Sequence, residues 1–276
     1  MSAKIDIHIH TTYSDGAYTP AEIVRRAYSV GLSTIALTDH DSVNGIKEAI
    51  NYGKELGIEV IPGLEISTDL DDKEVHLLAY FIDIENVELQ KYLLFFREER
   101  LHRAKRIIKK LQNIGLKITI EDVLDRSKNS AIGRPHIANT LLDLGITKNY
   151  LEAFEKYISD YGPAYERKIH VSPKSALKLI SEAGGLSFIA HPGYMDESLL
   201  LNLIKAGIDG IEVIHPSHNE SQVKFYRGIV NQYCLLSSGG SDFHGGKKDD
   251  EDNLGKYYIS LEQLDAMRKM LTKSSA

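Results

Sequence analysis

Short apolar runs alternate with segments of helical periodicity along residues 4–85, which is typical of βαβ units and a largely parallel sheet. The pattern predicts strands at "KIDIHI", "STIALTDHD", "IEVIPGLEIS" and "EVHLLAYFID". A first helix is predicted to begin at a capping box of Thr19 and Glu22, with Pro20 in its first turn, and to end at Gly31. A second helix, "VNGIKEAINYGKEL", is predicted to end at Gly57. This part of the chain therefore predicts an α/β fold.

The alternation of predicted strands and helices stops between residues 88 and 162. Apolar residues recur there at helical spacing through "LQKYLLFFREERLHRAKRIIKKLQNIG", and no convincing strand follows. Alternation resumes after Pro173, with strands predicted at "LSFIAHP", "GIEVIH" and "CLLSSGGSDFH". We therefore predict one α/β unit formed by residues 1–87 and 163–276, interrupted by a mostly helical insertion at residues 88–162.

Composition narrows the class of protein. With 276 residues, 42% of them hydrophobic and 26% charged, the chain can bury a full core without disulfides or structural metals. The net charge of −6 argues against a broad surface for nucleic acid, so we expect no stable DNA binding. No apolar run approaches the ~20 residues of a membrane span, and no signal peptide is evident, so we expect a mature chain with no membrane contact. Cys234, in "YCLLSS", is predicted to be a buried thiol, which favours a reducing cytoplasm.

The predicted strands share one feature, because "DIHIH", "ALTDHD", "PGLEIS", "FIAHP", "GGSDFH" and "IEVIHPSH" all end in residue types that bind metals. The carboxyl ends of strands in a parallel α/β barrel meet on one face, so these endings predict a single site. One such histidine alone would more often be a surface group. Of the 11 histidines, only His102 and His170 lack such a setting, and we expect these two to be solvated or structural. The others lie at or beside strand ends or in the "GRPH" turn: His8, His10, His40, His76, His136, His191, His215, His218 and His244.

The mixture of residue types points to a catalytic rather than a structural metal site. Imidazole suits zinc, iron and manganese, whereas carboxylates suit harder ions and can bridge two of them. The absence of cysteine from the cluster argues against a closed structural zinc. We therefore expect two or three divalent metal ions (Mn, Fe or Zn), about 3.5–4 Å apart and sharing a bridging hydroxide.

The motifs "DIHIHTTYSDG", "LTDHD", "PGLEIS", "VHLLAY", "AHPG" and "GSDFHG" resemble, in this order, those of the polymerase and histidinol phosphatase (PHP) family. The resemblance extends over residues 4–258, with the helical insertion included. The segments "GRPHIA" and "IEVIHPSH" resemble the stand-alone bacterial nucleoside 3',5'-bisphosphate phosphatase branch more than the histidinol phosphatases or the polymerase-attached domains.

This resemblance implies a distorted (β/α)7 barrel, TIM-like in outline, that holds up to three divalent metals. It implies one metal bound by His8, His10, Glu65 and Asp242, a second by Glu65, His76 and His191, and a third by Asp15, His40 and His244. Asp15 stands where several members of the family have histidine, so the third site differs in its donor atoms.

Substrate-side residues are predicted from their chemistry. Arg134 offers a planar fork for a phosphate in a turn stiffened by Pro135, beside His136; an exposed arginine at a helix start is the alternative. His215 and His218 are candidates to orient a phosphate or to protonate a leaving oxygen.

Supporting residues are predicted beside these candidates. Glu212 could orient the late histidines or cap its strand. Asp39 is predicted to fix an imidazole tautomer, and Gly16 and Gly240 to allow the backbone to approach the metals.

The predicted activity is hydrolysis of a phosphate monoester of a nucleotide, most of all a nucleoside 3',5'-bisphosphate, by the bridging hydroxide. A second hypothesis is a phosphodiesterase, in particular a 5'-3' exoribonuclease acting on short RNA. A third is a non-catalytic metal-binding domain, against which the retention of every ligand type argues.

Overall fold

The structure is a computed structural model of the 276-residue chain that describes all residues except 1–2, 71–72, 128–131, 170 and 275–276. The chain forms two compact units, residues 1–91 with 170–276 and residues 92–169. The predicted helical insertion at residues 88–162 overlaps the second unit. We describe each unit by itself.

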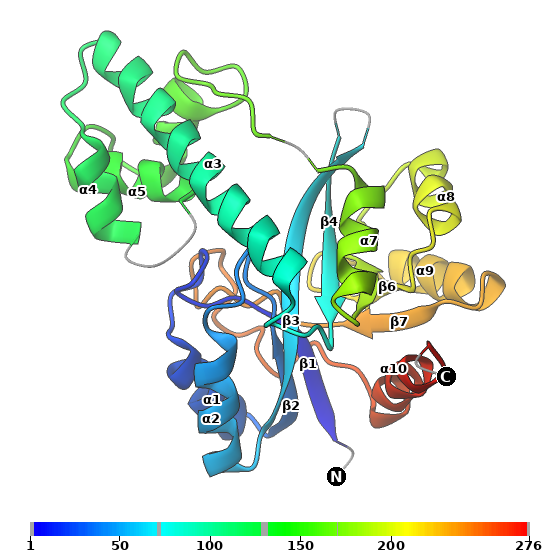
Figure 1. The fold of residues 1–276 in the computed structure, drawn as a ribbon. Coiled ribbons are helices and arrows are strands. Elements are labelled where there is room, and N and C mark those ends of the chain that lie inside the picture. The colour runs from blue at the N-terminus through cyan, green and yellow to red at the C-terminus, as the bar shows by residue number, and fades with distance from the viewer. Residues whose placement is uncertain (1–2, 71–72, 128–131, 170, 275–276) are drawn as a thin grey trace. The chain divides into compact units, whose positions relative to one another are not determined.

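The first unit is built on a seven-stranded sheet whose strands follow one another in sequence order (Figure 1). Most neighbouring strands are parallel, but β4 runs antiparallel to both β3 and β5. The prediction of a (β/α)7-like barrel is therefore confirmed, with one strand reversed. The strands are β1 (Lys4–Ile9), β2 (Leu32–Leu37), β3 (Glu59–Leu70), β4 (Lys73–Tyr80), β5 (Leu186–Ile189), β6 (Gly210–Ile214) and β7 (Leu236–Gly239).

The first and last strands meet without a regular ladder. An isolated bridge joins Ile9 to Phe243, whose carbonyl accepts a hydrogen bond from the His10 backbone N–H at 3.0 Å. The carboxylate of Asp6, on β1, accepts a bond from the Ser241 backbone N–H at 3.0 Å. Side-chain and loop contacts thus close the sheet between β1 and β7, where strand pairing is incomplete. These contacts hold the end of β7 close to β1.

Helices of the first unit begin and end largely where the sequence indicates. The capping box of Thr19 and Glu22 is present, and Gly57 ends the second helix in the left-handed conformation (φ 71°). That helix begins at Ile46 rather than Val43, and Gly45 precedes it without a side-chain cap. The helices are α1 (Pro20–Ser29), α2 (Ile46–Leu56), α7 (Pro173–Glu182), α8 (Glu197–Lys205), α9 (Glu220–Gln232) and α10 (Leu261–Ser274).

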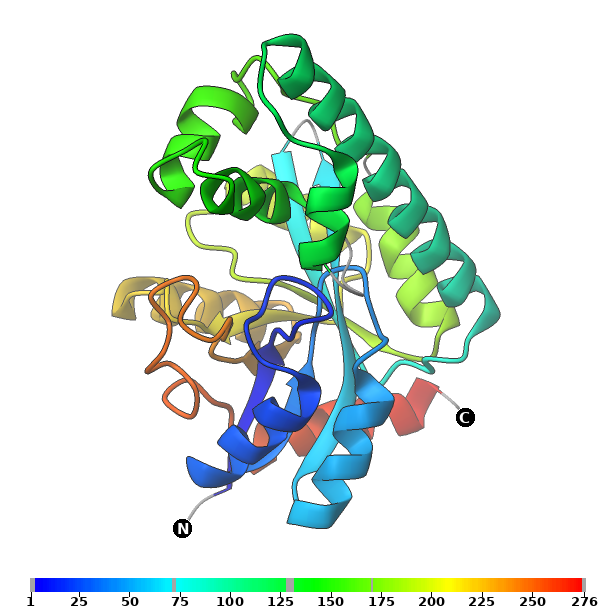
Figure 2. The same cartoon turned by 90° about the vertical axis from the view of Figure 1, so that its left-hand side faces the viewer.

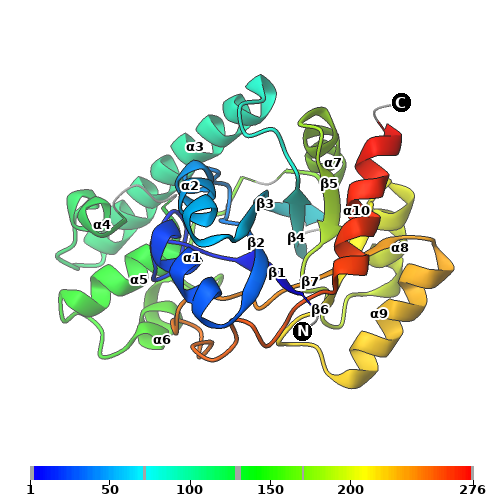
Figure 3. The same cartoon turned by 90° about the horizontal axis from the view of Figure 1, so that it is seen from below.

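Helix α10 was not predicted from the sequence, and it contributes to the core. Its Leu264 and Met267 are fully buried in the same cluster as Ile5 and Ile7 of β1 and Phe188 of β5. Figure 3 shows α10 in front of the strands when the unit is seen from below. The helix therefore packs against the amino-terminal part of β1, away from the residues that follow the strand.

The prediction for Cys234 is wrong, because this residue is exposed. It lies directly after Tyr233, the residue that follows α9, and adopts a left-handed backbone conformation (φ 53°) in the turn that leads to β7. The apolar run that suggested burial belongs to the strand, which begins only at Leu236.

The described residues of the second unit form helices joined by turns and loops (Figure 2). It contains most of α3 (Val87–Asn113), then α4 (Ile120–Ser127), α5 (Arg134–Asp143), α6 (Tyr150–Ala153) and a short π-helix, η1 (Phe154–Ile158). Its own buried cluster includes Ile107 and Leu111 of α3, Val123 of α4, and Ile137 and Leu141 of α5. The described residues of this unit thus agree with the mostly helical character predicted for residues 88–162, whereas the separate core was not predicted.

Among the described residues of both units, no helix combines the length and the hydropathy needed to cross a bilayer.

Candidate metal centre

The first unit brings the predicted metal ligands together at one end of the sheet. His8 and Glu65 lie within β1 and β3, whereas His10, His40 and His191 lie one, three and two residues after the ends of β1, β2 and β5. His76 lies in the first half of β4 and pairs with Ser67 of β3. Because β4 is reversed, its beginning lies at the end of the sheet where its neighbours finish. The groups of side chains that could hold a metal ion include all predicted ligands, together with Glu212 and His215, which were not predicted as ligands. The full set is His8, His10, Asp15, His40, Glu65, His76, His191, Glu212, His215, Asp242 and His244.

Glu65 lies at the middle of this cluster and is fully buried. One carboxylate oxygen, Oε1, lies 2.9 Å from Nδ1 of His76 and 3.0 Å from Nε2 of His191. The other, Oε2, lies 3.2 Å from Nε2 of His10 and 3.1 Å from Nδ1 of His40. The two oxygens thus face different sets of imidazoles, which is the arrangement that a carboxylate bridging two metal ions requires.

A second carboxylate completes the group around the first strand. Asp242 Oδ1 lies 3.3 Å from Nε2 of His8 and 3.1 Å from Nε2 of His10. Asp242 and His191 both have left-handed backbone conformations, with φ of 48° and 25°. Non-glycine residues adopt such angles at a cost, and their presence at two candidate ligands is consistent with a functional site.

The third group lies on loops. Asp15 Oδ1 is 3.3 Å from Nε2 of His244 and 3.6 Å from Nδ1 of His10, and His40 belongs to the same group. The predicted set of Asp15, His40 and His244 therefore comes together, with His10 shared between this group and the one around Asp242. Burial alone would raise the pKa of Asp15, but the imidazoles of His40 and His244 hold it well below its ordinary value.

The carboxylates also control the protonation of the imidazoles. Burial would lower the pKa of His10 and His76, yet Asp242 and Glu65 raise the pKa of His10 to about 9, and Glu65 raises that of His76 to about 9. His40 behaves differently, because burial lowers its pKa to about 3 against the opposing effect of Glu65. A metal that binds His10 or His76 must therefore displace a proton.

The sequence left two roles open for Glu212, to orient the late histidines or to cap its strand. In the structure it forms hydrogen bonds with two candidate ligands, His8 and His191. Its Oε1 accepts a hydrogen bond from Nδ1–H of His8 at 2.8 Å, and its Oε2 accepts one from the backbone N–H of His191 at 2.6 Å. In the neutral imidazole, donation from Nδ1 leaves the lone pair of His8 on Nε2, which faces Asp242 and Glu65. Burial would lower the pKa of His8, but Glu212 and Asp242 raise it well above its ordinary value, so a metal at Nε2 must displace a proton here as well. The signal in the sequence was a single carboxylate inside the apolar strand "GIEVI", since a buried charge needs partners.

Among the described residues, Asp39 has no direct hydrogen bond to an imidazole. Its carboxylate accepts hydrogen bonds from the backbone N–H and hydroxyl of Thr11 at 2.7 and 2.6 Å, and from the hydroxyl of Ser14 at 2.5 Å. Asp39 thus holds the turn after β1 and reaches Nδ1 of His10 only through Ser14, whose Oγ lies 3.4 Å from that nitrogen.

Glycine is required where the ends of β1 and β7 meet. A Cβ atom on Gly240 would lie 2.5 Å from the Cβ and backbone N of His8, and one on Gly16 would lie 2.5 Å from the carbonyl oxygen of His10. Both glycines therefore allow the backbone to approach the end of β1 closely, whereas the predicted approach to the metals stays a prediction.

His215 and His218 differ in what their ring nitrogens contact. Nδ1 of His215 accepts a bond from the Ser217 backbone N–H at 3.1 Å, so Nε2 carries the hydrogen and lies 3.4 Å from Asp242 Oδ2. In His218, Nδ1 donates to the Val213 carbonyl at 3.0 Å and Nε2 accepts from the Gly193 N–H at 3.1 Å. His215 therefore faces the cluster, whereas both nitrogens of His218 are engaged by the backbone.

Arg134 and His136 belong to the helical unit. Arg134 begins α5, and its guanidinium donates to the carboxylate of Asp160 at 2.5 Å. Nδ1 of His136 accepts a bond from the Gly133 backbone N–H at 3.1 Å, as in a helix cap. Their phosphate-binding role stays a prediction.

Of the two histidines expected outside the site, His102 is exposed on α3 beside Glu99, and His170 lies outside the described residues.

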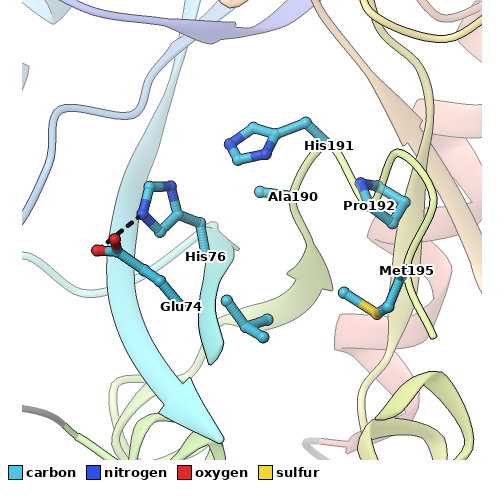
Figure 4. Close-up of a pocket in the computed structure, with 7 residues that line it drawn as sticks. Glu74, His76, Ala190, His191, Pro192 and Met195 are labelled. Atoms are coloured by element: carbon cyan, nitrogen blue, oxygen red, sulfur yellow. Dashed lines mark ion pairs between the residues drawn. The ribbon is translucent and has the colours of Figure 1, made fainter. Parts of the chain in front are cut away.

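A pocket of about 240 Å³ adjoins the candidate metal centre (Figure 4). It is lined by His76 of β4, His191 after β5, and Glu74, Pro192 and Met195. Glu74 pairs with the second ring nitrogen of His76 at 3.4 Å. The pocket gives a small molecule access to the side of the cluster formed by Glu65, His76 and His191.

The fold and the cluster define the class of protein as an α/β barrel with side chains able to hold several metal ions. A family model described as the PHP domain matches residues 6–266, so the chain belongs to the PHP domain family. The resemblance noted from the motifs is thereby confirmed.

Known proteins are similar in sequence to this chain over most of their own length. The 3',5'-nucleoside bisphosphate phosphatase of Chromobacterium violaceum is 34% identical over 249 residues, which cover 88% of this chain and 87% of that protein. A 5'-3' exoribonuclease of Haemophilus influenzae is 33% identical over 253 residues, covering 88% and 91%. A solved structure named a metal-dependent phosphoesterase, from Bifidobacterium adolescentis, is similar with a TM-score of 0.88 at 31% identity and covers 97% of this chain and 96% of that one.

Proposed function

We propose that the chain is a metal-dependent hydrolase of phosphate esters that removes a phosphate monoester from a nucleotide, with a nucleoside 3',5'-bisphosphate as the leading substrate. The observation that supports this most directly is the placement of Glu65, whose two oxygens face separate imidazole sets within one buried cluster. A structural site needs no such bridge, whereas hydrolysis of a phosphate ester uses two ions side by side.

The ligand assignment in this proposal is the one that the family resemblance implies. The residues that would hold the ions are His8, His10, Glu65 and Asp242 for the first, Glu65, His76 and His191 for the second, and Asp15, His40 and His244 for the third. All nine belong to the groups that could hold an ion, although His76 lies there with His40 and Glu65, and His191 with His8 and Glu65. The imidazole and carboxylate donors fit manganese, iron or zinc. When bound, such ions lower the pKa of water toward neutrality and stabilise negative charge on the phosphoryl oxygens.

His215 is the proposed proton donor or phosphate ligand of this chain. Its Nε2–H is directed at the cluster by the bond that Nδ1 accepts from Ser217, so the ring can donate to a phosphoryl or leaving oxygen without rotating. His218 was an equal candidate from the sequence, but its two backbone hydrogen bonds favour a supporting role for it. Arg134 and His136 are proposed to bind a second phosphate, on the chemistry of a guanidinium fork and an adjacent imidazole.

A second candidate function is 5'-3' exoribonuclease activity on short RNA. The relative from Haemophilus influenzae carries that name and matches this chain as completely as the phosphatase does. The same cluster of side chains would serve a diester, so the substrate must decide between the two activities. A non-catalytic metal-binding domain is the least favoured alternative, since all predicted ligand types come together in the cluster.

The deciding experiment offers several substrates to the manganese-loaded protein and follows inorganic phosphate and nucleotide products separately. The substrates are adenosine 3',5'-bisphosphate, adenosine 5'-monophosphate, a cyclic dinucleotide and a short 5'-phosphorylated RNA. Phosphate released from the bisphosphate alone supports the proposal. Mononucleotides released from the RNA favour the exoribonuclease, and no turnover of any substrate with manganese, iron or zinc would refute both.

Variants test the cluster itself. His10→Ala and Asp242→Asn are expected to lose bound metal and activity together while the circular dichroism spectrum stays that of the wild type. The matched control is His102→Ala, which removes an exposed histidine of the helical unit and is expected to retain metal and activity. Normal turnover by either ligand variant would show that the ligand assignment is wrong.

A further inference from the structure

We propose that the loop after β5 carries a base-binding subsite, in which the ring of Tyr194 is a stacking platform for the base of a nucleotide. This inference rests on the proposed function, because it takes the ligand to be a nucleotide. Tyr194 lies three residues after the candidate metal ligand His191, in the segment "HPGYM". Its side chain is 87% exposed, so nearly the whole ring is open to a ligand.

The position of Tyr194 suits a base whose phosphate lies at the metal centre. Three residues of fully extended chain span at most about 10 Å, so the Cα atoms of His191 and Tyr194 lie within that distance of one another. A nucleotide can span such a distance between its phosphate and its base. Pro192 and Met195, on either side of Tyr194 in the chain, line the pocket that adjoins the metal centre, together with His76 and His191 (Figure 4). The exposed ring therefore lies beside this pocket.

The ring of Tyr194 is held in place in spite of its exposure. Its hydroxyl oxygen accepts a hydrogen bond from Nδ2–H of Asn219 at 3.2 Å. Asn219 is itself fixed, because it is the N-cap of α9 and its Oδ1 accepts a bond from the backbone N–H of Gln222 at 3.0 Å. The tyrosine thus links the loop after β5 to the loop after β6. A ring that is already ordered loses less conformational freedom when a base stacks on it.

The backbone before the ring is fixed as well. The N–H of Gly193 donates to Nε2 of His218 at 3.1 Å, and the carbonyl of Gly193 accepts a bond from the hydroxyl of Tyr226 at 3.0 Å. The rings of His218 and Tyr226 stack, with their centroids 5.5 Å apart. Gly193 has a φ of 54°, which favours glycine. His218 therefore acts as a positioning residue, because it holds the loop that presents Tyr194.

These contacts distinguish Tyr194 from an ordinary exposed aromatic residue. A single tyrosine on a protein surface needs no explanation of its own. Here, hydrogen bonds fix both the hydroxyl of the ring and the backbone that precedes it, beside a pocket next to candidate metal ligands. Aromatic rings on which bases stack are a common means of binding single nucleotides and unpaired nucleic acid. Because a purine has a larger ring system than a pyrimidine, the subsite is expected to favour purine nucleotides.

The test compares three ligands that differ only in the base: adenosine 5'-monophosphate, uridine 5'-monophosphate and ribose 5-phosphate. Their dissociation constants are measured by isothermal titration calorimetry with the manganese-loaded protein. The wild type is expected to bind the adenosine nucleotide most tightly and ribose 5-phosphate most weakly. Tyr194→Ala is expected to weaken binding of the adenosine nucleotide at least about fivefold, since a stacked ring is lost, and to leave the affinity for ribose 5-phosphate unchanged.

Two further variants separate stacking from effects on the fold. Tyr194→Phe keeps the ring but loses the bond to Asn219, so its loss of affinity should be smaller than that of Tyr194→Ala. Tyr28→Ala is the matched control, because it removes an exposed tyrosine from α1 of the same unit, and it is expected to bind all three ligands as the wild type does. With adenosine 3',5'-bisphosphate as substrate, Tyr194→Ala should show a raised KM and an unchanged kcat, because the base takes no part in the chemistry.

The outcomes decide between the inference and the proposed function. Equal wild-type affinities for the adenosine nucleotide and ribose 5-phosphate overturn the inference, as does a Tyr194→Ala variant that binds the adenosine nucleotide normally. An equal loss for ribose 5-phosphate in Tyr194→Ala would point to a disturbed loop and also overturn it. Binding is measured independently of hydrolysis, so a base-specific loss in a protein that turns over no substrate supports the subsite and refutes the proposed function. Turnover without a base-specific loss has the opposite meaning.

Discussion

Replacement of Glu212 by glutamine tests whether one buried carboxylate prepares the metal centre. Both of its oxygens accept hydrogen bonds, one from Nδ1–H of His8 and the other from the N–H of His191. Burial would raise the pKa of Glu212, but the adjacent imidazoles, that of His8 first, hold it below the ordinary value, so the group is an anion. Glutamine has one accepting oxygen, and its NH₂ group must face one of these two donors.

The magnitude follows from the contact that is lost. If the amide nitrogen faces His8, the imidazole must turn or shift its hydrogen to Nε2, which removes the lone pair that a metal needs. Loss of such a supporting hydrogen bond typically costs 10–100-fold in metal affinity, or about 1.4–2.7 kcal/mol. Because Glu212 is fully buried and also supports His191, we expect a loss of about 100-fold in Glu212→Gln.

The assay is competition for manganese with a chromogenic chelator, with urea denaturation of the metal-free protein to confirm that the fold survives. Glu74→Gln is the matched control. Glu74 also pairs with a candidate ligand, His76, but its side chain is 48% exposed and 3.4 Å away, so we expect less than about a threefold loss. Metal affinity of Glu212→Gln within about twofold of the wild type would refute the reasoning.

Three further outcomes follow from the structure. Gly240→Ala is expected to lose about 1–3 kcal/mol of stability through overpacking and to weaken metal binding, whereas Gly228→Ala, with no atom within 4 Å of the added Cβ, should be neutral or slightly stabilising in the same urea titration. His10 and His76 each have a pKa of about 9, so both should release a proton when they bind a metal at pH 7. Calorimetry in buffers of different ionisation enthalpy should show this proton release, and metal affinity should rise with pH up to about 9. A metal affinity that does not change with pH would contradict this. Cys234, exposed at the end of the sheet opposite the ligands, should react fully with Ellman's reagent without loss of activity, and inactivation would place it nearer the site.

The sequence predicted the strands of the first unit and its helices other than α10, because each of these elements carries its own periodicity and caps. Periodicity says nothing about direction, so the reversal of β4 was not visible, and His76 lies near the start of its strand rather than at its end. Helix α10 had a usable signal that was overlooked. Ser260 and Gln263 form a cap-like pair at its start, with the backbone N–H of Ser260 donating to Gln263 at 3.0 Å.

The candidate ligands were predictable because chemistry and strand position act together. What the sequence could not supply was the pairing between residues far apart in the chain. Asp39 is next to His40 in sequence, yet its carboxylate binds the turn at Thr11, and Glu212 supports His8 instead. Lys248 stands in an acidic loop that looks solvated, and only the turn held by Asp250 directs it to His244.

The two parts of the centre differ in how they are held. His8 and Glu65 are fully buried on strands, and Glu212 fixes both His8 and the backbone of His191. Asp15 and Lys248 instead lie on loops, where substitutions disturb the packing of the sheet less. A change at Asp15 is therefore expected to alter the loop-borne group while the ligands carried by the strands keep their geometry.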